Sequence, residues 1–249
     1  MDEKSLSIRA LIAVLLFVGA GPTWAGADEC HPALDAARPQ VVIGYGSLME
    51  KKSKAMSAPT AGPNHPVRVS GFQRSWNDRG GRGPGFSTIF LGVQAAKGVQ
   101  MIAVAYSDPD RTNIGGTDAR EQSYCRIAVE PAKVEVLDGW ELPADAEIWI
   151  YTMKPDKIGR PDASRPIVQS YVDIFLSGCL QMQDLLRPEI AAKLDFASEC
   201  ITTTSGWSEH WKNDRIYPRR PWMYQRNAPT IDGLLKRLLP EYFDDIQIE

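Results

Sequence analysis

A glycine-rich turn near the start of the chain is its first candidate for chemistry. It follows the apolar run at residues 41–43 and consists of Gly44, Tyr45, Gly46, Ser47 and Leu48. Glycines at the end of a strand let several backbone N–H groups approach one point, and such groups hold a carboxylate or phosphate without a cation. The turn therefore predicts a site for a small anion, with a plain tight turn as the alternative.

Three well-known motifs do not fit these residues. A dinucleotide fingerprint needs Gly or Ala at the position of Met49, and a P-loop needs a Gly-Lys-Ser that does not follow this turn. A nucleophile elbow places its serine as G-x-S-x-G, whereas Ser47 is followed by Leu48 and Met49. A carboxylate site and a structural turn are the two interpretations that remain.

Glu121 provides the group that the turn lacks, a carboxylate that can take and return a proton. It lies in the polar segment from Asp118 to Arg126. A carboxylate beside a small anionic substrate can act first as a general base and then as a general acid. The spacing of Asp118 and Glu121 also matches a capping box, in which the glutamate bonds back to the N-cap N–H of a helix.

Short apolar segments rich in β-branched and aromatic residues must form the strands that position these groups. They lie at residues 41–43, 67–69, 87–93, 101–106, 126–129 and 146–153. Glycine and proline breakers between them favour a mixed sheet with many turns. After a linker at 154–166, apolar residues at helical spacing predict helices over 167–178 and around 234–239.

Three segments, in this order, resemble the gamma-glutamylcyclotransferase family. They are the Tyr45-Gly46-Ser47 turn, the segment Gly71-Phe72-Gln73-Arg74-Ser75-Trp76, and Glu121 followed by Tyr124 and Arg126. The resemblance spans residues 41–153 and implies an α+β fold, with a mixed, partly barrel-like β-sheet and flanking helices. The chain adds a C-terminal helical extension. It departs from many members at Gln122, where they have glycine, and in the strand at 101–106, which lacks their glycine.

The resemblance also implies an activity and a set of site residues. A small γ-glutamyl peptide or γ-glutamyl amine would release 5-oxoproline without a cofactor, with Glu121 as the catalytic base and acid. The substrate carboxylate would bind at Tyr45, Gly46, Ser47 and Leu48, and Tyr124 would line the site. Arg74 and Arg126 are further candidates for substrate binding, and each also fits a structural role in a strand.

The same residues also fit two other classes of function. One is a non-catalytic exported domain that binds an amino-acid-like ligand or serves as an interaction module. The other is a hydrolase or acyltransferase that acts on amides through the same carboxylate. Release of 5-oxoproline separates the cyclotransferase from both.

Composition limits the partners of the chain. The 249 residues are 43% apolar and 24% charged, which suffices for an ordinary globular core. The formal net charge of -3 provides no broad positive field for nucleic acid or for an anionic membrane surface. We therefore expect a small γ-glutamyl substrate as partner, no nucleic acid and no membrane, while the oligomeric state is not predicted.

The first residues have the order of a secretory signal. Lys4 and Arg9 precede an apolar stretch at residues 10–20, and small residues follow up to Ala27. We expect a signal peptide at 1–27 and an exported protein, periplasmic or secreted, with a retained N-terminal anchor as the alternative. The catalytic domain is expected at 40–155 and the helical extension at 164–249, with a lid at 202–229 as one interpretation of its Trp-rich and Arg-rich sequence.

Four cysteines fit an oxidising compartment. Cys30, Cys125, Cys179 and Cys200 allow two disulfides in three connectivities, with buried free thiols as the alternative. Cys179 with Cys200 is the preferred pair, because both lie in the helical C-terminal region. The three histidines are scattered and no C-x-x-C occurs, so no metal site is expected.

Overall fold

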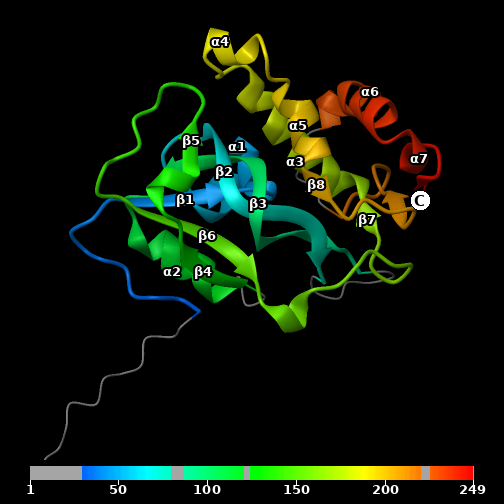
Figure 1. Cartoon of the computed structure of the whole chain (residues 1–249). Helices are drawn as coiled ribbons and strands as arrows, with labels where there is room; N and C mark the ends of the chain where they lie inside the picture. The colour runs from blue at the N-terminus through cyan, green and yellow to red at the C-terminus, as the bar shows by residue number, and fades with distance from the viewer. Residues whose placement is uncertain (1–29, 80–86, 121–123, 220–224, 249) are drawn as a thin grey trace, which may run out of the picture.

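The centre of the protein is a seven-stranded mixed sheet (Figure 1). The computed structural model describes residues 30–79, 87–120, 124–219 and 225–248. The strand order is β4-β6-β1-β3-β2-β5, and β8 pairs with β2. The strands are β1 Gln40–Gly44, β2 His65–Asp78, β3 Phe90–Ser107, β4 Tyr124–Ala128, β5 Val134–Val136, β6 Glu147–Met153 and β8 Thr204–Ser205. The expected signal peptide lies outside the described residues.

The sheet is mixed but it is not closed. Strand β1 runs parallel to β6 and antiparallel to β3, and β2 runs antiparallel to β3 and β5 and parallel to β8. Strands β4 and β5 lie at opposite ends of the order. The expected α+β fold with a mixed sheet and flanking helices is confirmed, and the sheet is not closed into a barrel, because no ladder among the described strands joins these two ends.

Strand β3 is longer than the sequence indicated. The apolar segments at 87–93 and 101–106 were expected as separate strands, yet β3 runs without a break from Phe90 to Ser107. Its middle residues are mostly exposed and pair with β2. Backbone pairing with β2 therefore continues the strand through a polar stretch that does not reach the core.

Helices cover the two sides of the sheet differently (Figure 1). Helix α2 (Arg111–Arg120) lies beside β4, and α1 (Lys51–Ser57) follows the glycine-rich turn. The C-terminal helices gather on the other side of the sheet. They are α3 Gln169–Gln183, α4 Pro188–Ala191, α5 Phe196–Thr202, α6 Ala228–Leu238 and α7 Pro240–Phe243.

A small second sheet accompanies these helices. It has the order β10-β9-β7, with β7 Ile167–Val168, β9 Trp211–Asn213 and β10 Gln247–Ile248. Ile167, expected at the start of a helix, lies in β7 instead, and the helix begins at Gln169. No helix within the described ranges is long and apolar enough to cross a membrane.

The C-terminal helices share a core with the central sheet. One buried cluster joins Met49, Leu91 and Ile102 to Phe175 and Ile201. Helix α3 packs so closely that a Cβ at Gly178 would come within 2.5 Å of the carbonyl carbon of Met49. A glycine is therefore needed where α3 crosses the end of the glycine-rich turn.

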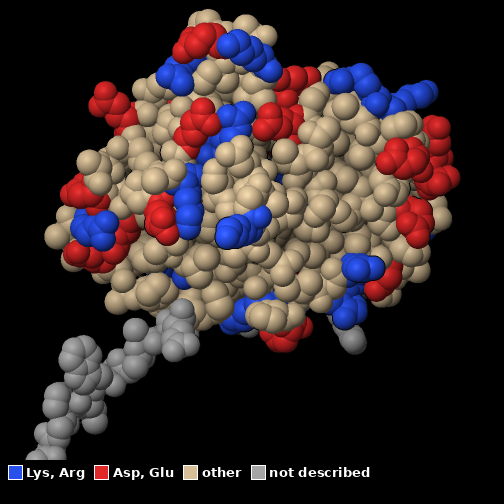
Figure 2. Space-filling view, viewed as in Figure 1, with Lys and Arg blue, Asp and Glu red and all other residues tan. Residues whose placement is uncertain are grey.

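Charged side chains are spread over the surface. Figure 2 shows Lys and Arg interspersed with Asp and Glu on the face that it draws, in keeping with a formal net charge of -3. This face has no single-sign patch large enough to attract a polyanion over a long distance.

Two disulfides tie distant segments to the sheet and the helices. Cys179 pairs with Cys200 and joins α3 to α5, which is the pairing that their common helical region favoured. Cys30 pairs with Cys125 and joins the N-terminal segment to β4. Both bonds are compatible with an exported protein, because disulfides persist in oxidising compartments.

Removing the α3–α5 disulfide should destabilise the protein. The variant Cys179→Ala/Cys200→Ala frees a loop with a sequence separation of 21 residues. Chain entropy predicts a loss of about 3 kcal/mol in the free energy of unfolding. Urea unfolding of the variant and of the wild type measures this loss, and equal midpoints for the two proteins would contradict the entropic argument.

Candidate functional site

Three successive N–H groups of the glycine-rich turn have no acceptor among the residues that the structure describes. Its carbonyl groups are used, because Gly46 O accepts from Met49 N at 3.1 Å and Leu48 O accepts from Asn64 Nδ2 at 3.0 Å. Within the described residues, no hydrogen bond uses the N–H groups of Gly46, Ser47 or Leu48. Gly46 is buried, and buried N–H groups nearly always have a partner. The turn can therefore donate to an anionic group.

Tyr45 anchors the turn to the sheet. Its hydroxyl donates to the carbonyl of Tyr151 in β6 at 2.7 Å, and its own carbonyl accepts from Arg74 Nη1 at 3.3 Å. Tyr45 is buried. Its side chain therefore fixes the start of the turn, and the backbone of the following residues is the part that can contact a ligand.

Tyr171 of α3 covers the turn from the helical side. A Cβ at Gly46 would lie 2.7 Å from the Tyr171 hydroxyl oxygen, so only glycine fits beneath it. The Tyr171 ring meets Trp76 and Phe90 edge to face, with centroids 5.8 and 5.0 Å away. The sequence indicated only a helical core position for Tyr171, because nothing local connects it with a turn that lies more than a hundred residues earlier.

A buried tyrosine–carboxylate pair lies next to this turn. Tyr124, the first residue of β4, donates through its hydroxyl to Asp78 Oδ2 at 2.7 Å and to Leu91 O at 3.2 Å. Burial raises the pKa of Tyr124 well above its ordinary value, and the nearby Tyr45 and Asp78 raise it further. Tyr124 therefore remains a neutral donor at physiological pH.

Leu91 connects the pair to the turn. Its carbonyl accepts from Tyr124, and its Cβ lies 3.7 Å from the Cβ position of Gly46. Leu91 therefore contacts both the Tyr124–Asp78 pair and the glycine-rich turn. Sequence reasoning named Tyr124 but not Asp78, because Asn77-Asp78-Arg79-Gly80 has the composition of an exposed turn.

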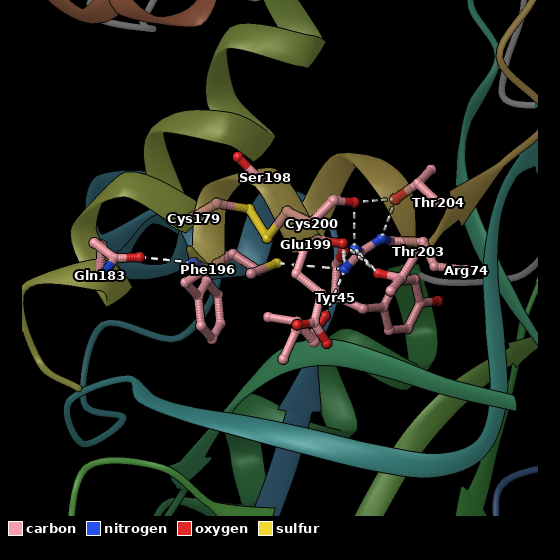
Figure 3. Close-up of a disulfide and its surroundings, with 12 residues drawn as sticks. Tyr45, Arg74, Cys179, Gln183, Phe196, Ser198, Glu199, Cys200, Thr203 and Thr204 are labelled. Carbon is pink, nitrogen blue, oxygen red and sulfur yellow. Dashed lines mark hydrogen bonds between the residues drawn. A yellow bond between two sulfur atoms is a disulfide. The ribbon is translucent and has the colours of Figure 1, made fainter. Parts of the chain in front are cut away.

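Arg74 contacts the start of the turn and is fully buried (Figure 3). Its Nε donates to Thr204 Oγ1 at 2.7 Å, its Nη1 to Ile102 O at 2.7 Å, and its Nη2 to Cys200 O at 2.8 Å. The guanidinium also lies over the Phe175 ring at 4.5 Å. Burial lowers the pKa of Arg74 to about 9, so the group is still a cation at neutral pH.

The donors of Arg74 serve the protein and not a substrate. They connect the turn, β3, β8 and the disulfide-bearing end of α5 (Figure 3). These contacts favour the structural role in a strand, which is the alternative to substrate binding that the sequence left open for Arg74. No charged partner could be inferred from the sequence, because most of the acceptors are backbone carbonyls of distant residues.

Arg126 also has a structural role. It is only 2% exposed, its Nε lies 3.0 Å from Asp118 Oδ1, and its Nη2 donates to Pro32 O at 2.6 Å. The guanidinium lies over the Trp149 ring at 4.4 Å. Arg126 is thus paired on the α2 side of the sheet, and the expectation that it contacts substrate is not supported.

The capping-box interpretation of Asp118 is wrong. Helix α2 ends at Arg120, so Asp118 lies in its last turn and not at an N-cap. Its carboxylate binds Arg126 and accepts from the Tyr151 hydroxyl at 2.6 Å. Because Tyr151 O accepts from Tyr45, this network supports the glycine-rich turn from the α2 side.

Glu121 lies outside the described residues. The described neighbours are Arg120, which ends α2, and Tyr124, which begins β4 and reaches Asp78. Of the expected lid at 202–229, residues 220–224 also lie outside them. In the described part, Trp207 stacks on Trp211 with centroids 5.1 Å apart and contacts Trp76 at 5.2 Å.

Comparison with known proteins identifies the fold. No family model and no curated protein matches the sequence. A solved structure described as a gamma-glutamyl cyclotransferase superposes with a TM-score of 0.51 and 13% identity, over 79% of this chain and 99% of that chain.

Two further solved structures are more distant. An uncharacterized protein from Homo sapiens has a TM-score of 0.49 and 16% identity, over 67% of this chain and 88% of its own. A yeast gamma glutamyl cyclotransferase specific to glutathione has a TM-score of 0.39 and 15% identity, over 82% of this chain and 97% of its own. The assignment depends on the first structure, and it establishes a gamma-glutamyl cyclotransferase-like fold, as the sequence motifs implied.

Proposed function

We propose that the protein is a cofactor-independent gamma-glutamylcyclotransferase-like enzyme that releases 5-oxoproline from a small γ-glutamyl peptide or γ-glutamyl amine. The observation that carries this proposal is the set of N–H groups at Gly46, Ser47 and Leu48, which have no acceptor within the described residues. They suit the α-carboxylate of a glutamyl group. The cyclotransferase-like fold gives independent support.

In the proposed reaction, the α-amine of the γ-glutamyl group attacks its own γ-carbonyl carbon. One C–N bond forms to close the five-membered lactam, and the γ-amide C–N bond breaks. Glu121 takes a proton from the attacking amine and passes it to the leaving amine, so the proton count balances. Because the nucleophile and the carbonyl belong to one molecule, their placement alone can contribute several kcal/mol.

The turn would select the reactive shape of the substrate. If its N–H groups hold the α-carboxylate, the amine and the γ-carbonyl can approach each other near Glu121 only when the glutamyl chain is curled. Tyr45 and Arg74 keep this turn in place from behind. The free energy of binding the α-carboxylate thereby serves to orient the amine and the γ-carbonyl for reaction.

A non-catalytic binding domain for an amino-acid-like ligand is the second candidate. It is favoured by the hydrogen bonds of the described side chains near the turn, since Tyr45 and Tyr124 both donate to protein acceptors. Hydrogen bonds of this kind hold the side chains of a binding site in fixed positions. They do not by themselves provide a group that carries a proton between the two amines. The two candidates predict different products in the same assay.

The test is incubation of the mature protein with γ-glutamyl dipeptides and γ-glutamyl amines, with 5-oxoproline measured by mass spectrometry. We expect release from substrates with a free α-amine and none from matched N-acetyl-γ-glutamyl compounds, whose acylated amine cannot attack. Release of free glutamate would instead indicate a hydrolase. Binding without release from any compound would favour the binding domain.

A further inference from the structure

The end of β2 departs from regular strand geometry beside the turn. Its last three residues, Trp76, Asn77 and Asp78, are all buried, although alternate residues of a strand normally face opposite sides. The pairing with β3 shifts between Trp76 and Asp78, which makes Asn77 the extra residue of a β-bulge. Bulges frequently redirect side chains next to active sites.

This bulge buries two oxygen acceptors. Asp78 is 5% exposed and receives the Tyr124 hydroxyl on Oδ2. Asn77 is equally buried. Its amide nitrogen donates to Gln94 Oε1 at 3.0 Å, while its Oδ1 has no hydrogen-bond partner in the described part of the chain. Buried acceptors of this kind suit a ligand that donates several hydrogen bonds.

Of these two acceptors, Asp78 is the one that a chain of contacts connects to the turn. Asp78 reaches Leu91 through the Tyr124 hydroxyl, and Leu91 in turn lies beside Gly46. An α-amino acid carries its carboxylate and its ammonium on one carbon atom. If the carboxylate binds the turn, the ammonium can point toward the carboxylate of Asp78.

From this geometry we propose that Asp78, held in place by Tyr124, recognises the α-ammonium of the substrate and makes the site selective for a free amino acid end. This inference rests on the proposed function for the identity of the substrate. It adds a specificity residue that is separate from Glu121. Asp78 would bind the ground state, so its loss should raise KM more than it lowers kcat.

Binding of two unreactive probes tests the role of Asp78. L-Glutamate and glutarate have the same carbon chain and carboxylates, and only L-glutamate has the ammonium. By calorimetry, we expect Asp78→Asn to weaken L-glutamate binding about tenfold to a hundredfold and to leave glutarate binding unchanged. The asparagine oxygen can still accept from Tyr124, so the bulge should persist.

Control variants separate recognition from folding. Asp156→Asn alters an exposed carboxylate beside Lys157 and should change neither affinity. The inference would be overturned if Asp78→Asn lost the same affinity for both probes or lost none. It would also be overturned if the wild type did not bind L-glutamate. The proposed function fails separately, if L-glutamate binds through Asp78 while no γ-glutamyl compound releases 5-oxoproline.

Discussion

Replacing Glu121 with glutamine is expected to lower the rate of 5-oxoproline release by about a hundredfold to ten-thousandfold. The amide has nearly the shape of the carboxylate but cannot take a proton from the attacking amine. At neutral pH an α-amine is mostly ammonium, so a site without a base must wait for the minor neutral form. The initial rate with a γ-glutamyl dipeptide, for the wild type and the variant at equal concentration, measures the effect.

The matched control for this variant is Glu130→Gln. The Glu130 side chain is 73% exposed and pairs with Lys133 on the surface, so its loss should leave the rate within error of the wild type. Equal thermal midpoints for all three proteins would exclude unfolding as the cause. If Glu121→Gln retained most of the wild-type rate, the proton carrier would have to be another group, and Asp78 would be the next carboxylate to replace.

The expected elements were found where local pattern and tertiary packing agree. The segment at 41–43 became β1, whose residues are all buried, and the leucines around 234–239 became the end of α6, whose apolar face packs on the core. The pattern failed for β3, whose polar middle is held by backbone pairing with β2. No periodicity of apolar residues can show such a continuation.

The candidate site was predicted only in part, because some of its residues come together through contacts between distant parts of the chain. The turn and Tyr124 stand out because glycine spacing and a family motif mark them locally. Tyr171 and Asp78 do not, because α3 and the bulge of β2 bring them to the turn from distant parts of the chain. Arg126 looked like a ligand in the motif, yet α2 places Asp118 beside it.

The second large effect is expected from Arg74→Met, which should reduce the free energy of unfolding by about 3 kcal/mol. Methionine fills part of the volume but donates nothing to Ile102 O, Cys200 O and Thr204 Oγ1, and buried acceptors without donors each cost about 1–3 kcal/mol. The variant no longer buries a charged guanidinium, and the desolvation cost that it thereby avoids offsets part of the cost of the unpaired acceptors. Urea unfolding followed by circular dichroism gives the difference.

Arg68 on the same strand provides the matched comparison. Arg68 is 24% exposed and pairs with Glu135 near the surface, so Arg68→Met should cost at most about 1 kcal/mol. Arg74→Lys should fall between the two, because one compact ammonium cannot serve acceptors on three separate elements at once. Arg74 donates to the carbonyl of Tyr45 and to that of Cys200. The stability of the α3–α5 disulfide region and the position of the glycine-rich turn therefore depend on the same side chain. If Arg74→Met unfolded at the same urea concentration as Arg68→Met, this side chain could not be what joins the helices to the turn.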